Sequence, residues 1–356
     1  GNGYSLAITD DGKVWSWGNN DSSQLGRVTA TGSPNALIPV EIPVVSGATI
    51  IEANAFAIPT KAHSAFIKNG EVYTVGNGEA GKLGNGSTAN KSSISITNLK
   101  SQSGGAEITD IELGSDFTLF LNINKFPWGV GANETYQITI PDAFSHRSKG
   151  VDYYVPVLSS LTPVRIKLSS VDVSNAKQVS AGWKHGLLMI DNDALVLWGD
   201  SSQGQGVDTL TTRNTAKTVG IESPIISSGY KNTYVLKTNK TVQSYGQNDK
   251  GQLGDGRTVA NSQAAATVIK NDNSILQNVK QIDDSTAITT NNDLWSWGIY
   301  PGDGSSFSRK AIQIAPIGKE LEMTIEQGGI INGEKEIKIT VKNYYNEPTV
   351  KFTQDS

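Results

Sequence analysis

The sequence contains no cysteine, and among its 356 residues there are only three histidines and two methionines. The absence of cysteine excludes disulfides, thiol nucleophiles and zinc sites built on thiolates. A chain without cysteine is compatible with secretion, although cytosolic chains can also lack it. On this basis we expect an extracellular or cell-surface protein of bacterial type.

Long apolar runs and strong charge are absent as well. No stretch is long and apolar enough for a membrane span or a signal peptide. The formal net charge is −4 and no basic arm is present, so the chain has no electrostatic signature of nucleic-acid binding. No Gly-x-Ser-x-Gly motif, no distinct carboxylate pair and no histidine pair at ligand spacing occurs. We therefore predict a non-enzyme with no catalytic residues, no cofactor and no metal.

What the chain does contain is a repeated step of an apolar or aromatic residue followed by glycine. The steps are separated by 58, 53, 70, 47 and 52 residues and are Trp17-Gly18, Val75-Gly76, Trp128-Gly129, Trp198-Gly199, Tyr245-Gly246 and Trp297-Gly298. A period of roughly 50 residues over the whole chain indicates one supersecondary unit copied around a ring or along a solenoid.

Each copy reads as short β-strands joined by tight turns. Asp11-Gly12 and Asn69-Gly70 separate alternating runs, and such pairs favour hairpin turns because both residues tolerate positive φ. Further β-like runs precede and follow most copies, for example 107–112 and 163–168. Four short antiparallel strands per period are the content of one propeller blade. Since no segment shows a helical apolar period, the sequence predicts an all-β β-propeller of four-stranded antiparallel blades.

The copies resemble the regulator-of-chromosome-condensation repeat family, whose pattern is Gly-x-x-His, a short strand, Asp-Gly, an aromatic strand, Trp-Gly, then Asn and Gly-Gln-Leu-Gly. The residues that fit position by position are Gly182, His185, Trp198, Gly199, Gly246, Asn248, Gly251, Gln252, Leu253 and Gly254. The resemblance covers about residues 1–316 and implies a seven-bladed β-propeller, of which six repeats are recognisable here.

The two ends of the chain are expected to close the ring. Gly1 starts in the middle of a blade, so we expect further sequence upstream. We assign 1–320 to the β-propeller and 321–356 to a ring-closing strand (321–327) and a C-terminal β-hairpin. The hairpin runs, 334–343 and 348–353, alternate strongly and carry no Trp-Gly step. They are either the last blade or the start of an appended Ig-like module.

The first candidate site is the link between the first and second strands of a blade. In a propeller these links emerge on one face around the central channel, and variable residues there suit a recognition surface on a fixed scaffold. Trp183 and Tyr230 are residue types typical of binding hot spots, and each precedes a lysine. We predict a partner-binding surface that contains Trp183, Lys184, Tyr230, Lys231 and Asp116. The alternative is that these aromatic residues only pack at the rim.

The strand tryptophans and two histidines have a structural interpretation instead. Trp198 and its counterparts are predicted to pack between blades. His63 and His185 occupy a strand-end position that Phe117 and Asn232 take in other copies, so a ligand role is excluded and a packing role predicted.

The second candidate site is the long third connection, 138–163, which carries Arg147, Tyr153 and Tyr154 between two apolar arms. Connections of this length in compact folds are usually functional or disordered. A protruding hairpin there would present a wedge, and the nuclear member of the family is similar in using a wedge from its own third repeat.

These observations favour a monomeric propeller that binds another protein or a surface ligand. The resemblance implies two alternatives: nucleotide exchange on a small GTPase, and inhibition of an enzyme such as a β-lactamase, which a bacterial family member achieves with aromatic residues from these links. A polysaccharide-cleaving propeller would need a carboxylate cluster lining the channel, and the sequence does not show one.

Overall fold

The fold was analysed on a computed structural model of the chain. It describes residues 1–27, 35–97, 99–139, 146–148, 151–153, 158–168, 171–191, 194–205, 213–219, 225–257, 261–299, 305–316, 322–331, 334–342 and 349–352.

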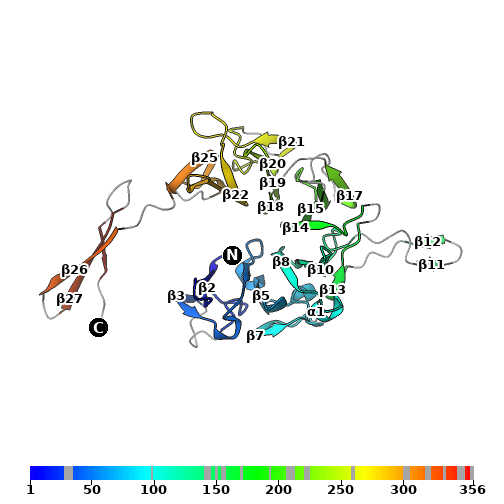
Figure 1. Cartoon of the computed structure of the whole chain (residues 1–356), viewed down its shortest axis with the longest axis horizontal. Coiled ribbons are helices and arrows are strands. Elements are labelled where there is room, and N and C mark those ends of the chain that lie inside the picture. The colour runs from blue at the N-terminus through cyan, green and yellow to red at the C-terminus, as the bar shows by residue number, and fades with distance from the viewer. Residues whose placement is uncertain are drawn as a thin grey trace.

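Six antiparallel sheets follow one another around a common centre, with the N-terminus close to that centre (Figure 1). This confirms the predicted all-β propeller. In chain order the sheets are β1 (Tyr4–Ile8), β2 (Val14–Asn19) and β3 (Asn35–Glu41); β4 (Ile50–Ala53), β5 (His63–Lys68), β6 (Glu71–Gly76) and β7 (Lys91–Ile96); β8 (Ile108–Leu113), β9 (Phe117–Asn122), β10 (Pro127–Ala132) and β13 (Ser159–Arg165); β14 (Ala176–Ala181), β15 (His185–Ile190), β16 (Leu195–Gly199) and β17 (Arg213–Val219); β18 (Ile225–Ser228), β19 (Asn232–Leu236), β20 (Val242–Gln247) and β21 (Asn261–Thr267); β22 (Val279–Asp283), β23 (Thr286–Thr289), β24 (Asp293–Ile299) and β25 (Phe307–Pro316).

Few elements lie outside the blades. They are the paired strands β11 (His146–Ser148) and β12 (Val151–Tyr153), the short helix α1 (Leu99–Gln102), and the 3-10 turns η1 (Pro43–Val45), η2 (Pro59–Lys61) and η3 (Glu79–Gly81). The C-terminal strands β26 (Glu322–Ile331), β27 (Glu334–Lys342) and β28 (Thr349–Phe352) form a sheet of their own. Within the described ranges the first blade shows three strands, with β1 innermost. The seventh blade and the division at residue 320 stay predictions.

The turns that the sequence marks make the hairpins. Asn69 and Gly70 between β5 and β6 both have positive φ, at 55° and 70°. That is the conformation of a two-residue turn whose twist matches the flanking strands. The strands it joins pair in register from His63 opposite Gly76 to Lys68 opposite Glu71. Turn chemistry thus fixes the register of this blade.

The hydrophobic core is divided among the spaces between successive blades. Phe66 and Val75 of the second blade pack on Val14 of the first, and Leu187 and Tyr245 bring the fourth and fifth blades together. The interface of the third and fourth blades buries Trp198 to 1 % exposure. Burial of one tryptophan removes about 200 Å² from water, worth up to about 5 kcal/mol. Each blade is therefore held by its neighbours, as expected for a ring of repeats.

The backbone carbonyl of a Gln or Lys in the turn that follows the penultimate strand links each blade to the next. Its oxygen accepts a hydrogen bond from a side chain of the following blade at all five interfaces between the six sheets. The donors and acceptors are Ser64 Oγ and Gln24 (2.6 Å), Thr118 Oγ1 and Lys82 (2.9 Å), Trp198 Nε1 and Gln137 (2.9 Å), Thr233 Oγ1 and Gln205 (2.9 Å), and Trp297 Nε1 and Gln252 (2.9 Å).

The third repeat is offset by two residues from the pattern in the sequence. Gly131, with φ of 107°, pairs with Phe117 as Gly199 pairs with His185. The N–H of the next residue then bonds to the link carbonyl, Ala132 to Asp116 at 2.8 Å. Thus Val130-Gly131, and not Trp128-Gly129, is the repeated step. The pattern in the sequence pointed to Trp128 because it is aromatic, whereas the repeated feature is a glycine with positive φ, here Gly131.

Candidate functional site

The predicted link residues lie at one end of neighbouring blades. Trp183 and Lys184 join β14 to β15, and Tyr230 and Lys231 join β18 to β19. Their backbones are tied side by side, since the N–H of Trp183 donates to the carbonyl of Tyr230 at 3.1 Å. The N–H of Ser115 in the third blade donates in turn to the carbonyl of Trp183 at 3.2 Å. The links of three consecutive blades therefore form a continuous, hydrogen-bonded rim.

The rings of Trp183 and Tyr230 stack on each other, with centroids 5.0 Å apart and planes inclined by 24°. Two ammonium groups flank them. Lys231 Nζ lies 4.6 Å from the Trp183 centroid and 5.5 Å from that of Tyr230, and Lys184 Nζ lies 5.1 Å from that of Trp183. These are cation–π distances, which hold the lysines against the rings. We call these four residues the aromatic–lysine cluster.

The cluster is accessible from solvent. Tyr230 is 45 % exposed, and the other three members are half-buried. Trp198, fifteen positions after Trp183, is fully enclosed between blades. Stacked aromatic side chains of this kind offer apolar area at a low entropy cost, because they are already ordered against each other. The structure brings together four of the eight predicted site residues.

Asp116 has a different environment. Its Oδ1 pairs with Lys82 Nζ at 3.2 Å, and Lys82 is completely buried. Burial lowers the pKa of the Lys82 ammonium, and the charge of Asp116 opposes that shift. Lys82 Nζ also donates to the carbonyl of Lys61 at 2.8 Å. Asp116 thus neutralises a buried lysine, a structural task that its position in the link did not indicate.

Arg147 and Tyr153 lie in the long third connection, on β11 and β12. The two strands pair antiparallel, with Arg147 opposite Asp152 and His146 opposite Tyr153. Figure 1 shows this hairpin projecting from the edge of the third blade. Tyr154 lies outside the described residues. A binding role for this hairpin remains a prediction.

A hollow of about 290 Å³ adjoins the aromatic–lysine cluster, between the fifth and sixth blades. Tyr230 forms one side and Ile299, 50 % exposed, forms another. Its lining residues are Tyr230, Asn232, Gln247, Asp249, Lys250, Gln252, Asp284, Ser285 and Ile299. Exposed apolar side chains beside a hollow suit the seating of a partner side chain.

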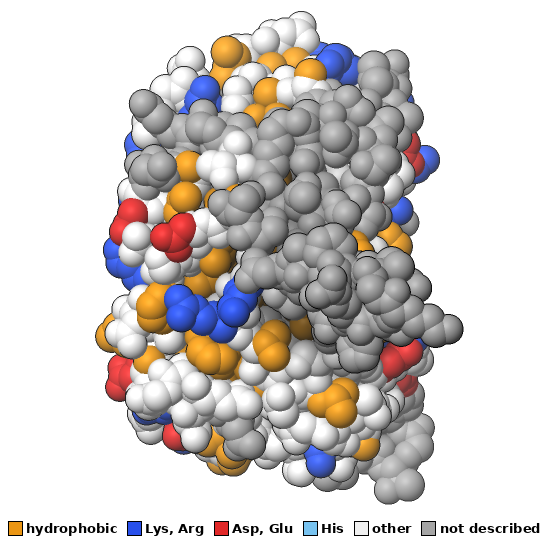
Figure 2. Space-filling model, turned by 90° about the vertical axis from the view of Figure 1, so that its right-hand side faces the viewer, with side chains coloured by type: hydrophobic (Ala, Val, Ile, Leu, Met, Phe, Trp, Pro, Cys, Tyr) orange, Lys and Arg blue, Asp and Glu red, His pale blue; other side chains and the backbone are white. Residues whose placement is uncertain are grey.

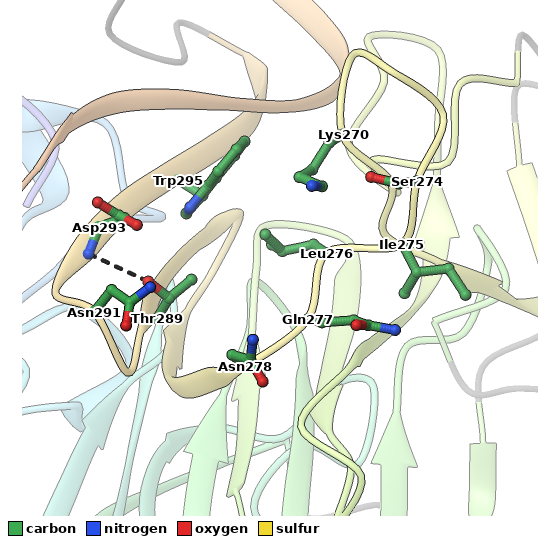
Figure 3. Close-up of a pocket in the computed structure, with 10 residues that line it drawn as sticks. All are labelled: Lys270, Ser274, Ile275, Leu276, Gln277, Asn278, Thr289, Asn291, Asp293 and Trp295. Atoms are coloured by element: carbon green, nitrogen blue, oxygen red, sulfur yellow. Dashed lines mark hydrogen bonds between the residues drawn. The ribbon is translucent and has the colours of Figure 1, made fainter.

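A second hollow of about 410 Å³ lies at the opposite end of these blades, beside the turn between β23 and β24 (Figure 3). Its lining residues are Lys270, Ser274, Ile275, Leu276, Gln277, Asn278, Thr289, Asn291, Asp293 and Trp295. The N–H of Asp293 donates to Thr289 Oγ1 at 3.2 Å. The indole N–H of Trp295 is buried and has no partner within the described part of the chain. The equivalent Trp15 and Trp128 share this property, so it belongs to the repeat.

The two histidines of the repeat are enclosed, as predicted. His63 is 0 % and His185 is 2 % exposed. His63 Nε2 lies 3.0 Å from Thr118 Oγ1 and its Nδ1 lies 3.2 Å from the Asn54 amide. Burial lowers the pKa of His185 to about 4, with the charge of Asp200 acting against it. Among the residues described, no three His, Asp or Glu side chains form a metal-binding group.

Carboxyl groups from the innermost strands gather at the centre of the ring. They are Glu52 on β4, Asp110 and Glu112 on β8, and Asp283 on β22. Burial, and then the charges of Asp283 and Asp110, raise the pKa of Glu52 to about 8. Burial raises the pKa of Asp110 to about 6. Burial and the charge of Glu52 raise the pKa of Glu112 well above its ordinary value.

This cluster could not be predicted from the sequence, because its members lie on strands that are up to four blades apart. The only sequence signal for it was an acidic residue near the end of several inner strands.

None of the helices in the described ranges is long and apolar enough to cross a membrane.

Two segments match models of known families. Residues 69–121 and residues 1–24 match two models that are both described as the regulator of chromosome condensation (RCC1) repeat. The matched segments contain β1 and β2 of the first blade and parts of the second and third blades.

Several curated proteins match this chain over part of their own length. The chain is 26 % identical to the ultraviolet-B receptor UVR8 of Arabidopsis thaliana, over 73 % of this chain and 54 % of the relative. It is 26 % identical to the Danio rerio protein RCC2 homolog, over 57 % and 41 %. It is 23 % identical to the guanine nucleotide exchange factor SRM1 of Saccharomyces cerevisiae, over 70 % and 56 %. The chain thus spans about half the length of the relatives it matches.

Solved structures share the fold. Yeast RCC1 (Prp20), in a crystal structure with Kap60, superposes with a TM-score of 0.70 at 19 % identity, covering 91 % of this chain and 75 % of that one. Human WBSCR16 gives a TM-score of 0.69 at 20 % identity, covering 90 % and 82 %. At these identities the likeness concerns the fold alone.

Proposed function

Since the chain is a β-propeller built from regulator-of-chromosome-condensation repeats, we propose that it is a non-catalytic protein that binds a partner protein. The partner binds to the link face, which is the face of the propeller that carries the links between the first and second strands of the blades. The aromatic–lysine cluster lies at the centre of the contact. The observation that carries the proposal is the exposed stack of Trp183 on Tyr230, with two lysines held over the rings. Aromatic residues dominate binding energy when a partner excludes water from them.

The geometry of the rim supports the same proposal. The backbone bonds between neighbouring links leave the cluster little freedom, so a partner meets a surface that is already ordered. The carbonyl of Lys184 also accepts the N–H of Asp200 at 2.9 Å, which anchors the link to the end of the blade. Yeast RCC1, a structural neighbour of the same fold, forms a complex with Kap60, which is consistent with a protein-binding role.

Affinity capture with the whole chain as bait tests the proposal. We expect a protein that the natural chain retains and that Trp183→Ala/Tyr230→Ala bait loses. A matched control is Lys237→Ala/Lys240→Ala, which changes the β19–β20 turn at the other end of the fifth blade. A retained protein that the aromatic double variant still binds at full strength would contradict the proposed contact.

Nucleotide exchange on a small GTPase is the second candidate, favoured by the relative named as a guanine nucleotide exchange factor. Release of a fluorescent guanine nucleotide from purified GTPases measures it directly. Acceleration by the natural chain supports exchange activity, and an unchanged release rate rejects it. In either case the cluster variants report whether the link face takes part.

A bacterial origin and a secreted or cell-surface location remain predictions that rest on the cysteine-free composition. Fractionation of the source cells with an antibody to the chain decides the location.

A further inference from the structure

We infer that the partner presents an acidic polypeptide segment with one large apolar side chain, bound along a basic aromatic band that runs from the fourth to the sixth blade. This inference rests on the proposed function and names the chemistry of the partner. The band consists of the aromatic–lysine cluster together with Lys250, Phe307 and Arg309.

The band is continuous on the link face. The 290 Å³ hollow is lined by both Tyr230 and Lys250, so it connects the cluster to the turn after β20. Lys250 Nζ then lies 5.8 Å from the ring centroid of Phe307, and the guanidinium of Arg309 lies 5.0 Å from it. The turn and the last strand touch closely, since a Cβ on Gly251 would lie 2.5 Å from Arg309 Cα. Two cation–π groups therefore flank one hollow.

The positive charges of the band have no acidic partner among the residues that the structure describes. None of Lys184, Lys231, Lys250 and Arg309 lies within ion-pair distance of a carboxylate in the described part of the molecule. Some lysines elsewhere are paired, as Lys61 is with Glu79 at 2.9 Å and Lys125 with Asp191 at 2.8 Å. Arg309 Nε is even buried without a hydrogen-bond partner among the residues described.

The carboxylates nearest the band are occupied. Asp249 Oδ1 accepts from the amides of Gln247 at 2.8 Å and Gln252 at 3.0 Å. Asp284 is half-buried, lines the hollow and lies next to Tyr234, and burial raises its pKa to about 7. The chain as a whole carries a net charge of −4, so four cations on one face that have no ion pair with a described residue are a local excess. On the side that Figure 2 shows, Lys and Arg side chains likewise lie directly beside hydrophobic ones.

Carboxylates of a polypeptide fit this band better than a nucleic-acid strand does. Trp183 and Tyr230 already stack on each other, so no base can enter between them. Spaced carboxylates can instead meet Lys184, Lys231, Lys250 and Arg309 individually, while the apolar residue fills the hollow between Tyr230 and Ile299.

Fluorescein-labelled peptides test the inference by fluorescence polarisation with the whole chain. The first probe alternates Glu and Gly around one central Leu. The second has Lys in place of Glu, the third has Gly in place of Leu, and the fourth is an oligothymidylate of equal length. We expect the acidic Leu peptide to bind most tightly, and its affinity to fall with rising salt because the contact is charge-based.

Charge reversal locates the contact. Lys184→Glu/Lys231→Glu is expected to weaken the acidic peptide by about tenfold or more, as removal of central interface charges does. Lys237→Glu/Lys240→Glu makes the same change in charge at the other end of the fifth blade and is expected to leave the affinity within about twofold. Circular dichroism melts of both variants show whether the fold is retained.

Each other outcome overturns the inference. No binding of the acidic peptide, equal weakening by both double variants, or tighter binding of the thymidylate would each reject an acidic polypeptide at this band. Preference for the Lys peptide, abolished by Trp183→Ala, would reject the acidic chemistry while leaving the proposed protein-binding function intact.

Discussion

The indole N–H of Trp198 donates a 2.9 Å hydrogen bond to the main-chain carbonyl of Gln137 in the turn of the preceding blade. Trp297 makes the same bond to Gln252 two blades further on. Where the repeat has no tryptophan at this position, a serine or threonine hydroxyl bonds to the equivalent carbonyl, as Ser64 does to Gln24. The turn carbonyl is thus the common hydrogen-bond acceptor between successive blades, and the glycines of the turn fix its position.

Trp198→Ala should destabilise the fold by roughly 3–5 kcal/mol, because it empties a fully buried site and leaves the Gln137 carbonyl without its donor. Trp198→Phe should cost less, since it keeps most of the packing and loses the hydrogen bond. Urea or guanidinium denaturation of both variants measures the difference. Equal stability of Trp198→Ala and the natural chain would show that this interface does not support the ring.

Trp183→Ala should leave the thermal midpoint nearly unchanged, because the ring is half-buried and packs on Tyr230 at the surface. The same variant should weaken a bound partner by about 2 kcal/mol or more. Thermal melts followed by a binding titration on one preparation test both statements. If Trp183→Ala unfolds the chain as severely as Trp198→Ala does, the cluster is part of the core and not a recognition surface.

Gly131→Ala should be among the most damaging glycine substitutions. Its φ is 107°, and an added Cβ would lie 2.5 Å from the carbonyl oxygen of Asp116. Gly86 is a matched control, with φ of 79° and nothing within 4 Å of an added Cβ. Gly86→Ala should cost about 1 kcal/mol from backbone strain alone, and Gly131→Ala clearly more. Equal losses of stability in the Gly131→Ala and Gly86→Ala variants would contradict the assignment of Gly131 as the repeat glycine of the third blade.

The sequence allowed the architecture and the link residues to be predicted, because both follow from local patterns. Asn69-Gly70 specifies a turn by itself. Trp183 is an aromatic residue at a variable position between Gly182 and His185, which fit the repeat pattern. The third repeat was offset because Trp128 resembles the aromatic step while Gly131 carries the backbone constraint. Contacts between distant segments were not predictable in this way. The pairing of Asp116 with Lys82 depends on how two blades face each other.

Substitutions of Lys82 should separate the effect of its charge from that of its hydrogen bonds. Lys82→Ala removes the ion-pair partner of Asp116 and the donor to the carbonyls of Lys61 and Ser115, so we expect a loss of about 3 kcal/mol. Lys82→Gln should cost less, because glutamine occupies this turn position in other blades, for example at Gln252. Denaturation midpoints compare the two. A Gln variant as unstable as the Ala variant would show that the ammonium charge itself is required.

The carboxyl cluster at the centre of the ring should make stability fall as pH rises from about 4.5 to about 8. Burial and the charges of Asp283 and Asp110 raise the pKa of Glu52 from 4.5 to about 8, so the folded chain holds a proton there that the unfolded chain releases. A group with a raised pKa in the folded state stabilises below its ordinary value, and this contribution is lost as pH rises through the folded value.

The opposite trend comes from His185, whose pKa burial lowers from 6.5 to about 4, and it is confined to pH below 6.5. Thermal midpoints between about pH 6.5 and 8 therefore exclude the contribution of His185, and comparison with Glu52→Gln gives the contribution of Glu52. Glu52→Gln, which mimics the protonated form, should melt higher than the natural chain at the upper end of this window and show a flatter pH profile. Glu134→Gln, at an exposed position, is the control and should run parallel to the natural chain. If the Glu52→Gln profile is parallel too, the carboxyl groups at the centre do not couple to folding.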